Sequence, residues 1–317
     1  MAVYTQVSAE ALTAFLTRYD AGELVSAKGI AEGVENSNYL VDTTTARFIL
    51  TLYEKRVAAG DLPFFMALLE HLAAAGLAVP PAIRDRDGTQ IQQLEGRPAC
   101  LIRFLTGVSV SHPTEAQARA AARAMGTMHA AVADFTPTRD NSMGIATWRP
   151  LLERCGRDLD TIRAGLYDRV AVALDAVETA WPTHLPVSAI HADLFPDNVL
   201  MLGDEVTGLI DFYFACTDVR AYDLAVMHSA WTFDAKGENA SRTIGAALLD
   251  GYTQGFPLSA GERAALPVLA RGACIRFLLS RAYDWIHTPP DALVMRKDPL
   301  AYLNRLAWYE ANPAAFA

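Results

Sequence analysis

The sequence predicts an α+β fold in two lobes, a small β-rich N-terminal lobe and a larger helical C-terminal lobe. Short strand-like runs separated by turn residues occupy most of the chain up to about residue 104. Beyond Leu105-Thr106-Gly107, apolar residues recur at helical spacing in long Ala-rich stretches. We therefore divide the chain into an N-terminal lobe, residues 1–105, and a C-terminal lobe, residues 106–317.

The N-terminal lobe is expected to be a sheet with an embedded helix. Ser8 precedes Leu12 at the spacing of a helix cap, which predicts a first helix. A second helix is expected from Asp61 through Leu72, because Gly76 follows it as a stop signal. The strand-like runs cover residues 24–30, 38–42, 47–53, 82–84, 90–94 and 99–104.

The C-terminal lobe is expected to be helical with one β-hairpin. Helical spacing covers residues 113–132, 148–156, 162–181, 221–233, 239–252 and 260–286. In the hairpin, residues 199–203 lead out to a turn at Asp204-Glu205 and residues 206–210 lead back. In that antiparallel register, Asn198 is opposite Asp211.

Composition limits the classes of function. A chain of 317 residues with 52% hydrophobic residues can bury a sizeable core. The net charge of −9 argues against a nucleic-acid partner, because proteins that bind phosphate backbones usually have a basic face. No run reaches the ~18 apolar residues of a membrane span. We therefore expect a cytoplasmic protein that binds neither nucleic acid nor membrane.

The cysteines give no sign of a zinc site or a disulfide framework. They are widely spaced and contain no C-x-x-C pair. Reduced, buried thiols are the better interpretation, and they fit a cytosolic protein. The four residues are Cys100, Cys155, Cys216 and Cys274.

The segment from His191 to Asn198 carries the most informative motif. Asp193 stands five residues before Asn198, and an apolar strand follows at once. Asp211 ends the return strand, where an acid is costly unless it is ligated or hydrogen-bonded. The pattern predicts a phosphoryl-transfer site, in which Asn198 and Asp211 hold Mg²⁺ and Asp193 accepts the proton of an attacking hydroxyl. The alternative is an ordinary turn in which Asp193 and Asn198 bond their own backbone.

This segment resembles the catalytic loop and metal-binding Asp of the aminoglycoside-phosphotransferase-like kinases, which are relatives of the protein kinases. Further matches cover nearly the whole chain and are similar to the proteobacterial type of homoserine kinase that has this fold. They include GIAEGVENSNY at 29–39, FILTLYE at 48–54, DFYFAC at 211–216 and RAYDW at 281–285. The resemblance implies a bilobal protein-kinase-like fold, with ATP and Mg²⁺ as cofactors and L-homoserine as the small-molecule substrate.

The resemblance also assigns roles around the motif. In such kinases the residue at the place of His191 usually stabilises the loop by hydrogen bonding, so we group His191 with Asp193 and keep proton transfer as the alternative. His129 is expected to be a core histidine and not a ligand. Asp223 is expected to cap its helix or to stabilise the catalytic loop.

A nucleotide site is expected in the N-terminal lobe. The resemblance implies a loop over the ATP phosphates, made of Gly29, Gly33, Asn36, Ser37 and Asn38; an ordinary turn is the alternative. It also implies a hinge that meets adenine, made of Arg103, Phe104 and Leu105. The cleft between the lobes is where the nucleotide would lie.

Thr51 departs from the family pattern. Related kinases carry a Lys there, which pairs the phosphates and a helix Glu that Glu70 would match. We interpret Thr51 as part of a variant phosphate clamp, with the missing charge supplied by Lys28, Arg47 or Lys55.

The substrate is expected to contact residues beyond Asp211. A carboxylate calls for an Arg fork, and an ammonium group calls for an acid or an aromatic face. The candidates are Tyr213, Trp231, Asp234, Arg276 and Arg281, of which Tyr213, Trp231 and the two arginines are chosen. A structural ion pair with Asp223 or Asp284 is the alternative for both arginines. The chain would act as a monomer or a homodimer.

Two other functions stay open. The first keeps the fold and changes the acceptor to choline, methylthioribose or an aminoglycoside. The second is a nucleotide-binding regulatory module without turnover, which Thr51 motivates.

Overall fold

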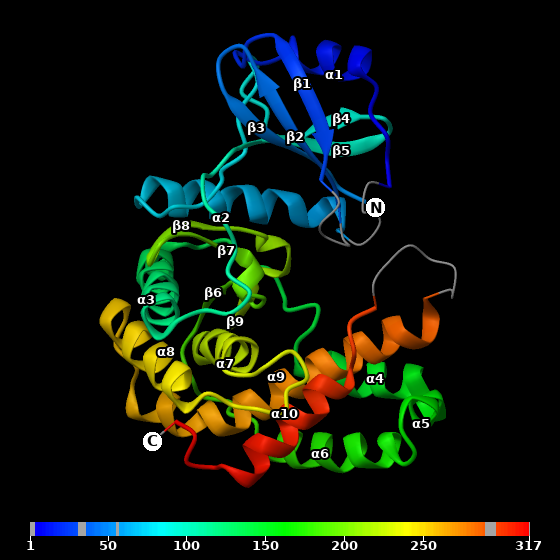
Figure 1. Cartoon of the computed structure of the whole chain (residues 1–317), viewed down its shortest axis with the longest axis vertical. Coiled ribbons are helices and arrows are strands. Elements are labelled where there is room, and N and C mark those ends of the chain that lie inside the picture. The colour runs from blue at the N-terminus through cyan, green and yellow to red at the C-terminus, as the bar shows by residue number, and fades with distance from the viewer. Residues whose placement is uncertain (1–3, 31–35, 55–56, 289–295, 317) are drawn as a thin grey trace. The chain divides into compact units, whose positions relative to one another are not determined.

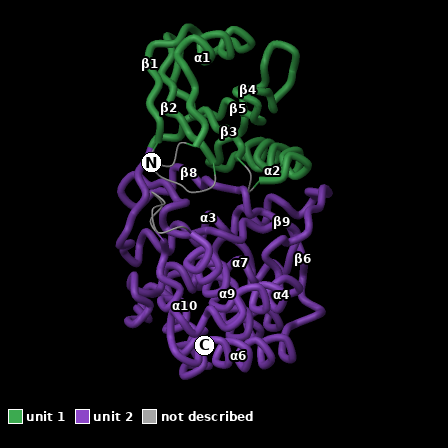
Figure 2. The backbone as a smooth tube through the Cα atoms, turned by 90° about the vertical axis from the view of Figure 1, so that its right-hand side faces the viewer, with its two compact units in different colours: residues 1–106 green, residues 107–317 purple. Residues whose placement is uncertain are grey.

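The computed structural model describes residues 4–30, 36–54, 57–288 and 296–316 (Figure 1). The chain forms two compact units, Met1–Thr106 and Gly107–Ala317, called here the N-terminal and C-terminal units (Figure 2). The first unit is built around a sheet and the second is mainly helical, so the predicted α+β class is confirmed.

A five-stranded antiparallel sheet forms the centre of the N-terminal unit, in the order β1-β2-β3-β5-β4. The elements are α1 Ala9–Leu16, β1 Leu24–Gly29, β2 Ser37–Thr43, β3 Arg47–Leu52, a 3₁₀ turn Ala59–Asp61, α2 Leu62–Ala74, β4 Gln92–Leu94 and β5 Arg97–Arg103. Ser8 caps α1, since its side chain accepts a hydrogen bond from the N–H of Ala11. Leu12 and Phe15 of α1 belong to one buried cluster with Leu50 of β3 and Leu101 of β5.

One predicted strand of this unit is absent as a strand. Residues 82–84 contribute only an isolated bridge, in which Ala82 pairs with Ile102. The prediction was wrong because three residues between turn signals do not distinguish a strand from an extended connection.

The C-terminal unit packs its helices around α7. The helices are α3 Glu115–Ala131, α4 Ile145–Cys155, α5 Leu159–Ile162, α6 Leu166–Ala180, α7 Arg220–Trp231, α8 Arg242–Gly255, α9 Ala260–His287 and α10 Leu300–Ala311, with 3₁₀ turns at Val132–Asp134 and Gly156–Asp158. Every residue of α7 from Ala221 to Trp231 is buried, and the helix contacts α3, α8 and α9 (Figure 1). A helix buried on all sides can hold a polar side chain only where partners satisfy it, which makes its Asp223 notable.

Helices α3 and α8 pack with their backbones in close contact. A Cβ atom at Gly251 of α8 would lie 2.1 Å from the carbonyl oxygen of Arg119 in α3. Glycine is therefore needed at this crossing, because any larger side chain would push the helices apart.

Two short antiparallel ribbons interrupt the helices. β6 Val187–Ile190 pairs with β9 Cys216–Val219, and β7 Val199–Leu202 pairs with β8 Glu205–Leu209. The first ribbon spans the second in the sequence, so the chain enters and leaves the 191–215 region on neighbouring strands.

The register of the β7–β8 hairpin differs by one residue from our prediction. Val199 pairs with Leu209, and the N–H of Ile210 donates to the carbonyl of Asn198 at 3.0 Å. Ile210 is therefore opposite Asn198, and Asp211 follows it. The expectation that Asn198 and Asp211 are paired directly was wrong.

The cause is a different turn combined with a bulge. Leu202 pairs with Glu205, so the turn is Gly203-Asp204 and not Asp204-Glu205. The register then shifts between Leu200 and Met201, where Thr207 is the extra residue on the facing strand. A β-bulge of this kind moves every later pair by one position.

None of the helices in the described part of the chain is both long and apolar enough to cross a membrane. Within the same residues the four cysteines are buried and unpaired.

Candidate active site

The loop between β6 and β7 carries the motif residues. It contains a 3₁₀ turn, Pro196–Asn198, which Pro196 begins and in which the N–H of Asn198 donates to the carbonyl of Phe195 at 3.0 Å. The side-chain amide of Asn198 donates to the backbone carbonyl of Asp193 at 2.8 Å and lies 3.5 Å from its carboxylate. Because the NH₂ group of Asn198 is used in this way, its Oδ1 is the atom left to accept a bond or bind a cation.

Asp223 holds the beginning of the loop. Its carboxylate, fully buried in α7, accepts the backbone N–H of His191 at 2.8 Å and that of Ala192 at 2.7 Å. It also accepts the Nε2–H of His129 at 3.1 Å. Burial alone would raise the pKa of Asp223, but the bond from His129 and the nearby histidines and backbone outweigh it, so the pKa lies below its ordinary value. Of its two predicted roles, the structure supports stabilisation of the loop.

His129 is confirmed as a core histidine. It is 1% exposed, Nε2 bonds Asp223, and Nδ1 shares a 2.8 Å hydrogen bond with the hydroxyl of Tyr252. The two hydrogen bonds of His129 thus connect α3 to Asp223 of α7 and to Tyr252 of α8. Since both ring nitrogens are occupied, His129 has no free atom for a metal.

His191 connects the loop to the hairpin. Its Nε2–H donates to the carbonyl of Ile210 at 3.0 Å, and its ring lies 4.4 Å from that of Phe212. Burial lowers the pKa of His191 and keeps the ring neutral. These contacts agree with the expected stabilising role, and a part in proton transfer stays a prediction.

Ala192 and Asp211 both have left-handed backbones. Their φ angles are +62° and +66°, a region that costs an L-residue about 1–2 kcal/mol. A non-glycine residue stays there when its surroundings fix it, and such positions are frequent at functional sites. For Ala192 the fixing contacts are explicit: Asp223 takes its N–H, and Arg276 donates to its carbonyl at 2.7 Å.

Two of the predicted substrate residues contact the loop itself. Nη1 of Arg276 also lies 3.6 Å from Oδ1 of Asp193, and the residue is 2% exposed. The indole N–H of Trp231 donates to the carbonyl of Leu194 at 2.8 Å. Both side chains therefore stabilise the loop, whichever further contacts they make with a substrate.

Arg281 is placed differently. It is half-buried on α9, its guanidinium lies 4.6 Å from the ring centroid of Tyr302, and its Nη1 has a long, 3.4 Å hydrogen bond to the carbonyl of Asp298. Burial lowers the pKa of Arg281, although Asp193 and Asp197 are near enough to act in the opposite sense. Tyr213 lies in the 3₁₀ turn Phe212–Phe214, directly after Asp211.

The residues predicted to bind the nucleotide lie on β1, β2 and β3. Gly29 ends β1 opposite Tyr39, and Gly33 lies outside the described residues. The Thr51 hydroxyl donates to Oδ1 of Asn38 at 2.7 Å across the β2–β3 pair. Thr51, where the resemblance predicts a Lys, is thus a buried support for Asn38.

The hydroxyl of Ser37 and Oδ1 of Asn36 already form hydrogen bonds within the N-terminal unit. The hydroxyl of Ser37 donates to Glu54 at 2.8 Å and accepts the backbone N–H groups of Tyr4 and Thr5. Asn36 Oδ1 accepts the N–H of Glu54 at 3.3 Å. Sequence reasoning missed Glu54 as the centre of this network, although a carboxylate closing the apolar strand β3 gives the same signal that singled out Asp211.

Two other charged residues singled out in this unit, Glu70 and Arg47, have ion-pair partners within it. Glu70 forms a two-pronged ion pair with Arg84, and Arg47 bonds Asp42 at 2.6 Å while lying over the ring of Phe104. Arg103 is exposed at the end of β5. The expected match between Glu70 and a phosphate-binding cation therefore has no support in these contacts.

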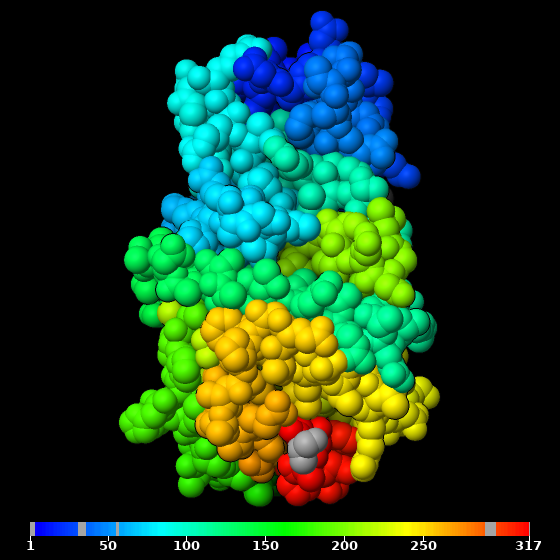
Figure 3. All heavy atoms as spheres, turned by 90° about the vertical axis from the view of Figure 1, so that its left-hand side faces the viewer, coloured from blue at the N-terminus to red at the C-terminus, as the bar shows by residue number. Residues whose placement is uncertain are grey.

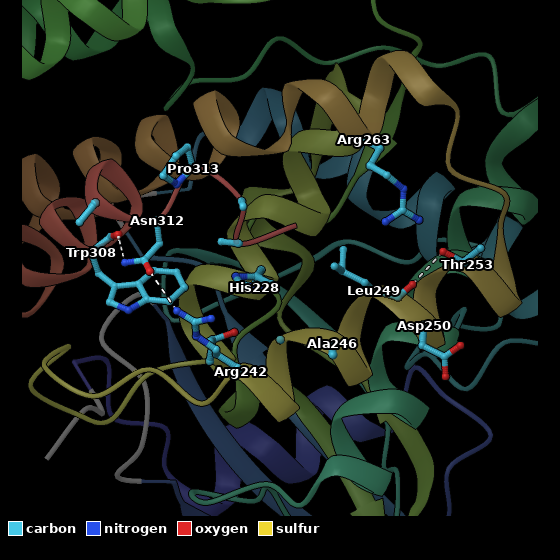
Figure 4. Close-up of a pocket in the computed structure, with 15 residues that line it drawn as sticks. His228, Arg242, Ala246, Leu249, Asp250, Thr253, Arg263, Trp308, Asn312 and Pro313 are labelled. Atoms are coloured by element: carbon cyan, nitrogen blue, oxygen red, sulfur yellow. Dashed lines mark hydrogen bonds between the residues drawn. The ribbon is translucent and has the colours of Figure 1, made fainter. Parts of the chain in front are cut away.

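A pocket of about 650 Å³ lies elsewhere in the C-terminal unit (Figure 4). The end of α7, helix α8, the start of α9 and the segment after α10 line it; Figure 3 shows the last residues in red beside the orange start of α9. Arg242 donates to Asn312 and Arg263 to the carbonyl of Phe316. None of the predicted site residues lines this pocket, so it is separate from the motif loop.

Comparison with known proteins identifies the family. Residues 26–258 match the model of the phosphotransferase enzyme family. A homoserine kinase from Methylorubrum populi is 54% identical over 309 residues, which cover 98% of this chain and 96% of that protein. A homoserine kinase from Zymomonas mobilis is 53% identical, with 98% and 97% covered.

Solved structures agree on the fold. The microcompartment-associated aminopropanol kinase has a TM-score of 0.76 at 19% identity, with 98% of each chain covered. Spectinomycin phosphotransferase has a TM-score of 0.73 at 13% identity, with 98% of this chain and 100% of that chain covered. The family predicted from the motif loop is confirmed. The chain belongs to the phosphotransferase enzyme family and, within it, to the group of the homoserine kinases.

Proposed function

We propose that this protein transfers the γ-phosphoryl group of ATP to the side-chain hydroxyl of L-homoserine, which yields O-phospho-L-homoserine for threonine biosynthesis. The observation that carries this proposal is identity above 50% to homoserine kinases over almost their whole length. The distant solved structures contribute only the fold, since their acceptors differ.

Asp193 is the proposed base. It is partly exposed, its backbone carbonyl is held by Asn198, and its carboxylate faces Nη1 of Arg276. A positioned carboxylate can orient the substrate hydroxyl and take its proton as the new bond forms. The protein needs to supply little covalent chemistry for this reaction, because positioning of the reactants and neutralisation of the phosphate charge account for most of the rate enhancement.

Asn198 and Asp211 are the proposed ligands of Mg²⁺. The donor set fits this ion, which prefers carboxylate and amide oxygens, and Oδ1 of Asn198 is left open by the bond that its NH₂ group makes. The bond between Ile210 and Asn198 keeps both residues at the same end of the hairpin. When bound, the ion neutralises charge on the phosphate groups of ATP.

The nucleotide would be held by the β1–β2 connection and β3. Since the hydroxyl of Ser37 is bonded within the fold, we propose that backbone N–H groups here and the Asn38 side chain meet the phosphates. Thr51 would fix Asn38 for this contact. The roles of Gly29, Gly33 and the hinge residues 103–105, and the cation that replaces the family Lys, remain predictions.

Arg281 is the proposed ligand of the homoserine carboxylate. Its guanidinium is partly desolvated, and among the described residues it forms no ion pair, so a carboxylate would be its natural partner. Arg276 and Trp231 are less suited because Nη1 of Arg276 and the indole N–H of Trp231 already bond the loop. Contact of Tyr213 with the substrate stays a prediction, as do the cytoplasmic location and the monomeric or homodimeric state.

An acceptor panel tests the proposal. ADP release from Mg-ATP would be measured with L-homoserine, 3-amino-1-propanol, choline, methylthioribose and an aminoglycoside. The proposal expects homoserine to give the highest kcat/KM, and 3-amino-1-propanol, which lacks the carboxylate, to lose at least about tenfold. Preference for an acceptor without a carboxylate would contradict it. ATP binding without transfer to any acceptor would support a regulatory module.

A further inference from the structure

Arg276 is the most enclosed cation that touches the motif loop. Its guanidinium carbon lies 4.1 Å from the ring centroid of Phe277 and 5.2 Å from that of Phe214, and the residue is 2% exposed. One nitrogen, Nη1, donates to the carbonyl of Ala192 at 2.7 Å and lies 3.6 Å from Oδ1 of Asp193. A guanidinium in such surroundings is costly to bury unless its contacts are used.

We propose that Arg276 is a positioning residue for phosphoryl transfer, which holds the Ala192 peptide in its left-handed turn and so fixes the direction of the Asp193 carboxylate. The inference rests on the proposed role of Asp193 as the base. It assigns to α9 a part in catalysis that the motif itself, confined to residues 191–211, does not contain.

The backbone of Ala192 explains why a second contact is needed. At φ +62° an alanine residue is less stable than in an ordinary turn, whereas glycine adopts this conformation freely. Asp223 holds the N–H of Ala192 and Arg276 holds its carbonyl, so the peptide groups on both sides of the strained residue are fixed. Without Arg276 the following peptide can rotate and carry Asp193 with it.

The position of the charge also argues for this role. Arg276 is directed at the loop, and its face is covered by two aromatic rings, which leaves less of the fork for a substrate. Arg281 lies five residues further along α9 and contacts Asp298 and Tyr302. We therefore expect substitution of Arg276 to change mainly kcat and substitution of Arg281 to change mainly the KM for homoserine.

The central experiment compares Arg276→Gln with the matched variant Arg281→Gln. For Arg276→Gln we expect kcat to fall by roughly 100-fold with the KM for homoserine changed less than about threefold, because misplacing a reacting group lowers the rate of an already bound complex. For Arg281→Gln we expect the KM for homoserine to rise by at least about tenfold with a smaller change in kcat. Arg276→Gln with a raised KM and normal kcat, or with normal values of both, would overturn the inference.

Arg276→Lys is a second variant that tests the inference if Arg276→Gln does not fold. The ammonium group keeps the positive charge but lacks the planar fork, so we expect a kcat between those of the wild type and Arg276→Gln. Circular dichroism melting checks that each variant is folded. If Arg276→Gln does not fold, normal kcat in Arg276→Lys together with a raised KM would overturn the inference.

Ala192→Gly provides the readout that a purely structural role would not move. Since glycine adopts the left-handed backbone without cost, Arg276→Gln should lower kcat less in an Ala192→Gly background than in the wild-type background, by roughly fivefold. An equal loss of kcat in the two backgrounds would contradict the proposed hold on Ala192.

The proposed function is tested separately by the wild type and Asp193→Asn. If the wild type uses another acceptor, the same kinetic comparison is made with that acceptor. If Asp193→Asn keeps normal kcat, the role of Asp193 fails, and the inference on Arg276 fails with it.

Discussion

The carboxylate of Asp223 accepts the backbone N–H of Ala192 at 2.7 Å, across 31 residues of sequence. This bond joins helix α7, buried from Ala221 to Trp231, to the loop that carries Asp193. A buried helix of the C-terminal unit thus fixes the loop that carries Asp193, and substitutions in α7 should change both the stability of the fold and the activity.

Asp223→Asn is expected to lower the free energy of unfolding by roughly 2–4 kcal/mol, because a neutral amide cannot accept all three donors that the carboxylate satisfies. Urea denaturation measures the change. Asp175→Asn is the control, since Asp175 is exposed and pairs with Arg149 at the surface, and it should cost less than about 1 kcal/mol. Equal stability of the two variants would contradict the role given to Asp223.

The stability of the fold should fall as the pH drops from 7 to 5, in part through His228. Burial lowers the pKa of this histidine to about 3, and Nδ1 bonds the hydroxyl of Tyr309 at 2.5 Å. A depressed pKa means that stability is full above the unfolded value near 6.5 and is lost as protons bind the unfolded chain, by about 2 kcal/mol at pH 5.

Urea denaturation at pH 7, 6 and 5 tests the contribution of His228. His228→Gln should remove about 2 kcal/mol of the pH dependence, whereas His184→Gln, at an exposed position, should leave the slope unchanged. A slope that is the same in the wild type and in His228→Gln would show that other groups cause it.

Asp211→Ala is expected to weaken the apparent affinity for Mg²⁺ by roughly tenfold or more, because one of two proposed oxygen ligands is lost. The rate at fixed ATP would be measured over a Mg²⁺ titration. Asp204→Ala is the control, an acid in the turn of the same hairpin. Identical Mg²⁺ curves for both variants would argue against Asp211 as a ligand.

Thr51→Val is expected to raise the KM for ATP by roughly three- to tenfold, because Asn38 loses a 2.7 Å hydrogen bond in a buried place. Thr51→Ser keeps the hydroxyl and should stay near the wild type. Steady-state kinetics with varied ATP make the comparison. If Thr51→Val has the wild-type KM for ATP, Thr51 contributes to the sheet and not to ATP binding.

The sequence was sufficient for the fold class, the division between sheet and helices, and the motif loop. It was sufficient because strand and helix periodicities differ strongly, and because His191, Asp193, Asn198 and Asp211 lie close together in the chain. Contacts of this short range can be argued from spacing alone.

The hairpin register and the contacts between distant residues could not be predicted, because they depend on packing that the periodicity of apolar residues does not report. The one-residue error in the hairpin came from the turn, which lies one residue earlier than predicted, combined with a bulge at Thr207 that offsets part of that shift. Alternation of apolar residues locates neither feature. The contact of Arg276 with Ala192 spans 84 residues, so an arginine in an apolar helix indicated a partner without indicating which one. The partners of Glu54 could not be predicted for the same reason, since Thr5 and Arg97 are distant in sequence.

The most direct test of the central claim is ³¹P NMR of a reaction with Mg-ATP and L-homoserine, run with the wild type and with Asp193→Asn. The account predicts a phosphomonoester signal of O-phospho-L-homoserine for the wild type and a rate at least about 1,000-fold lower for the folded variant. A wild type that forms no phosphohomoserine, or a variant that forms it at a normal rate, would contradict the account.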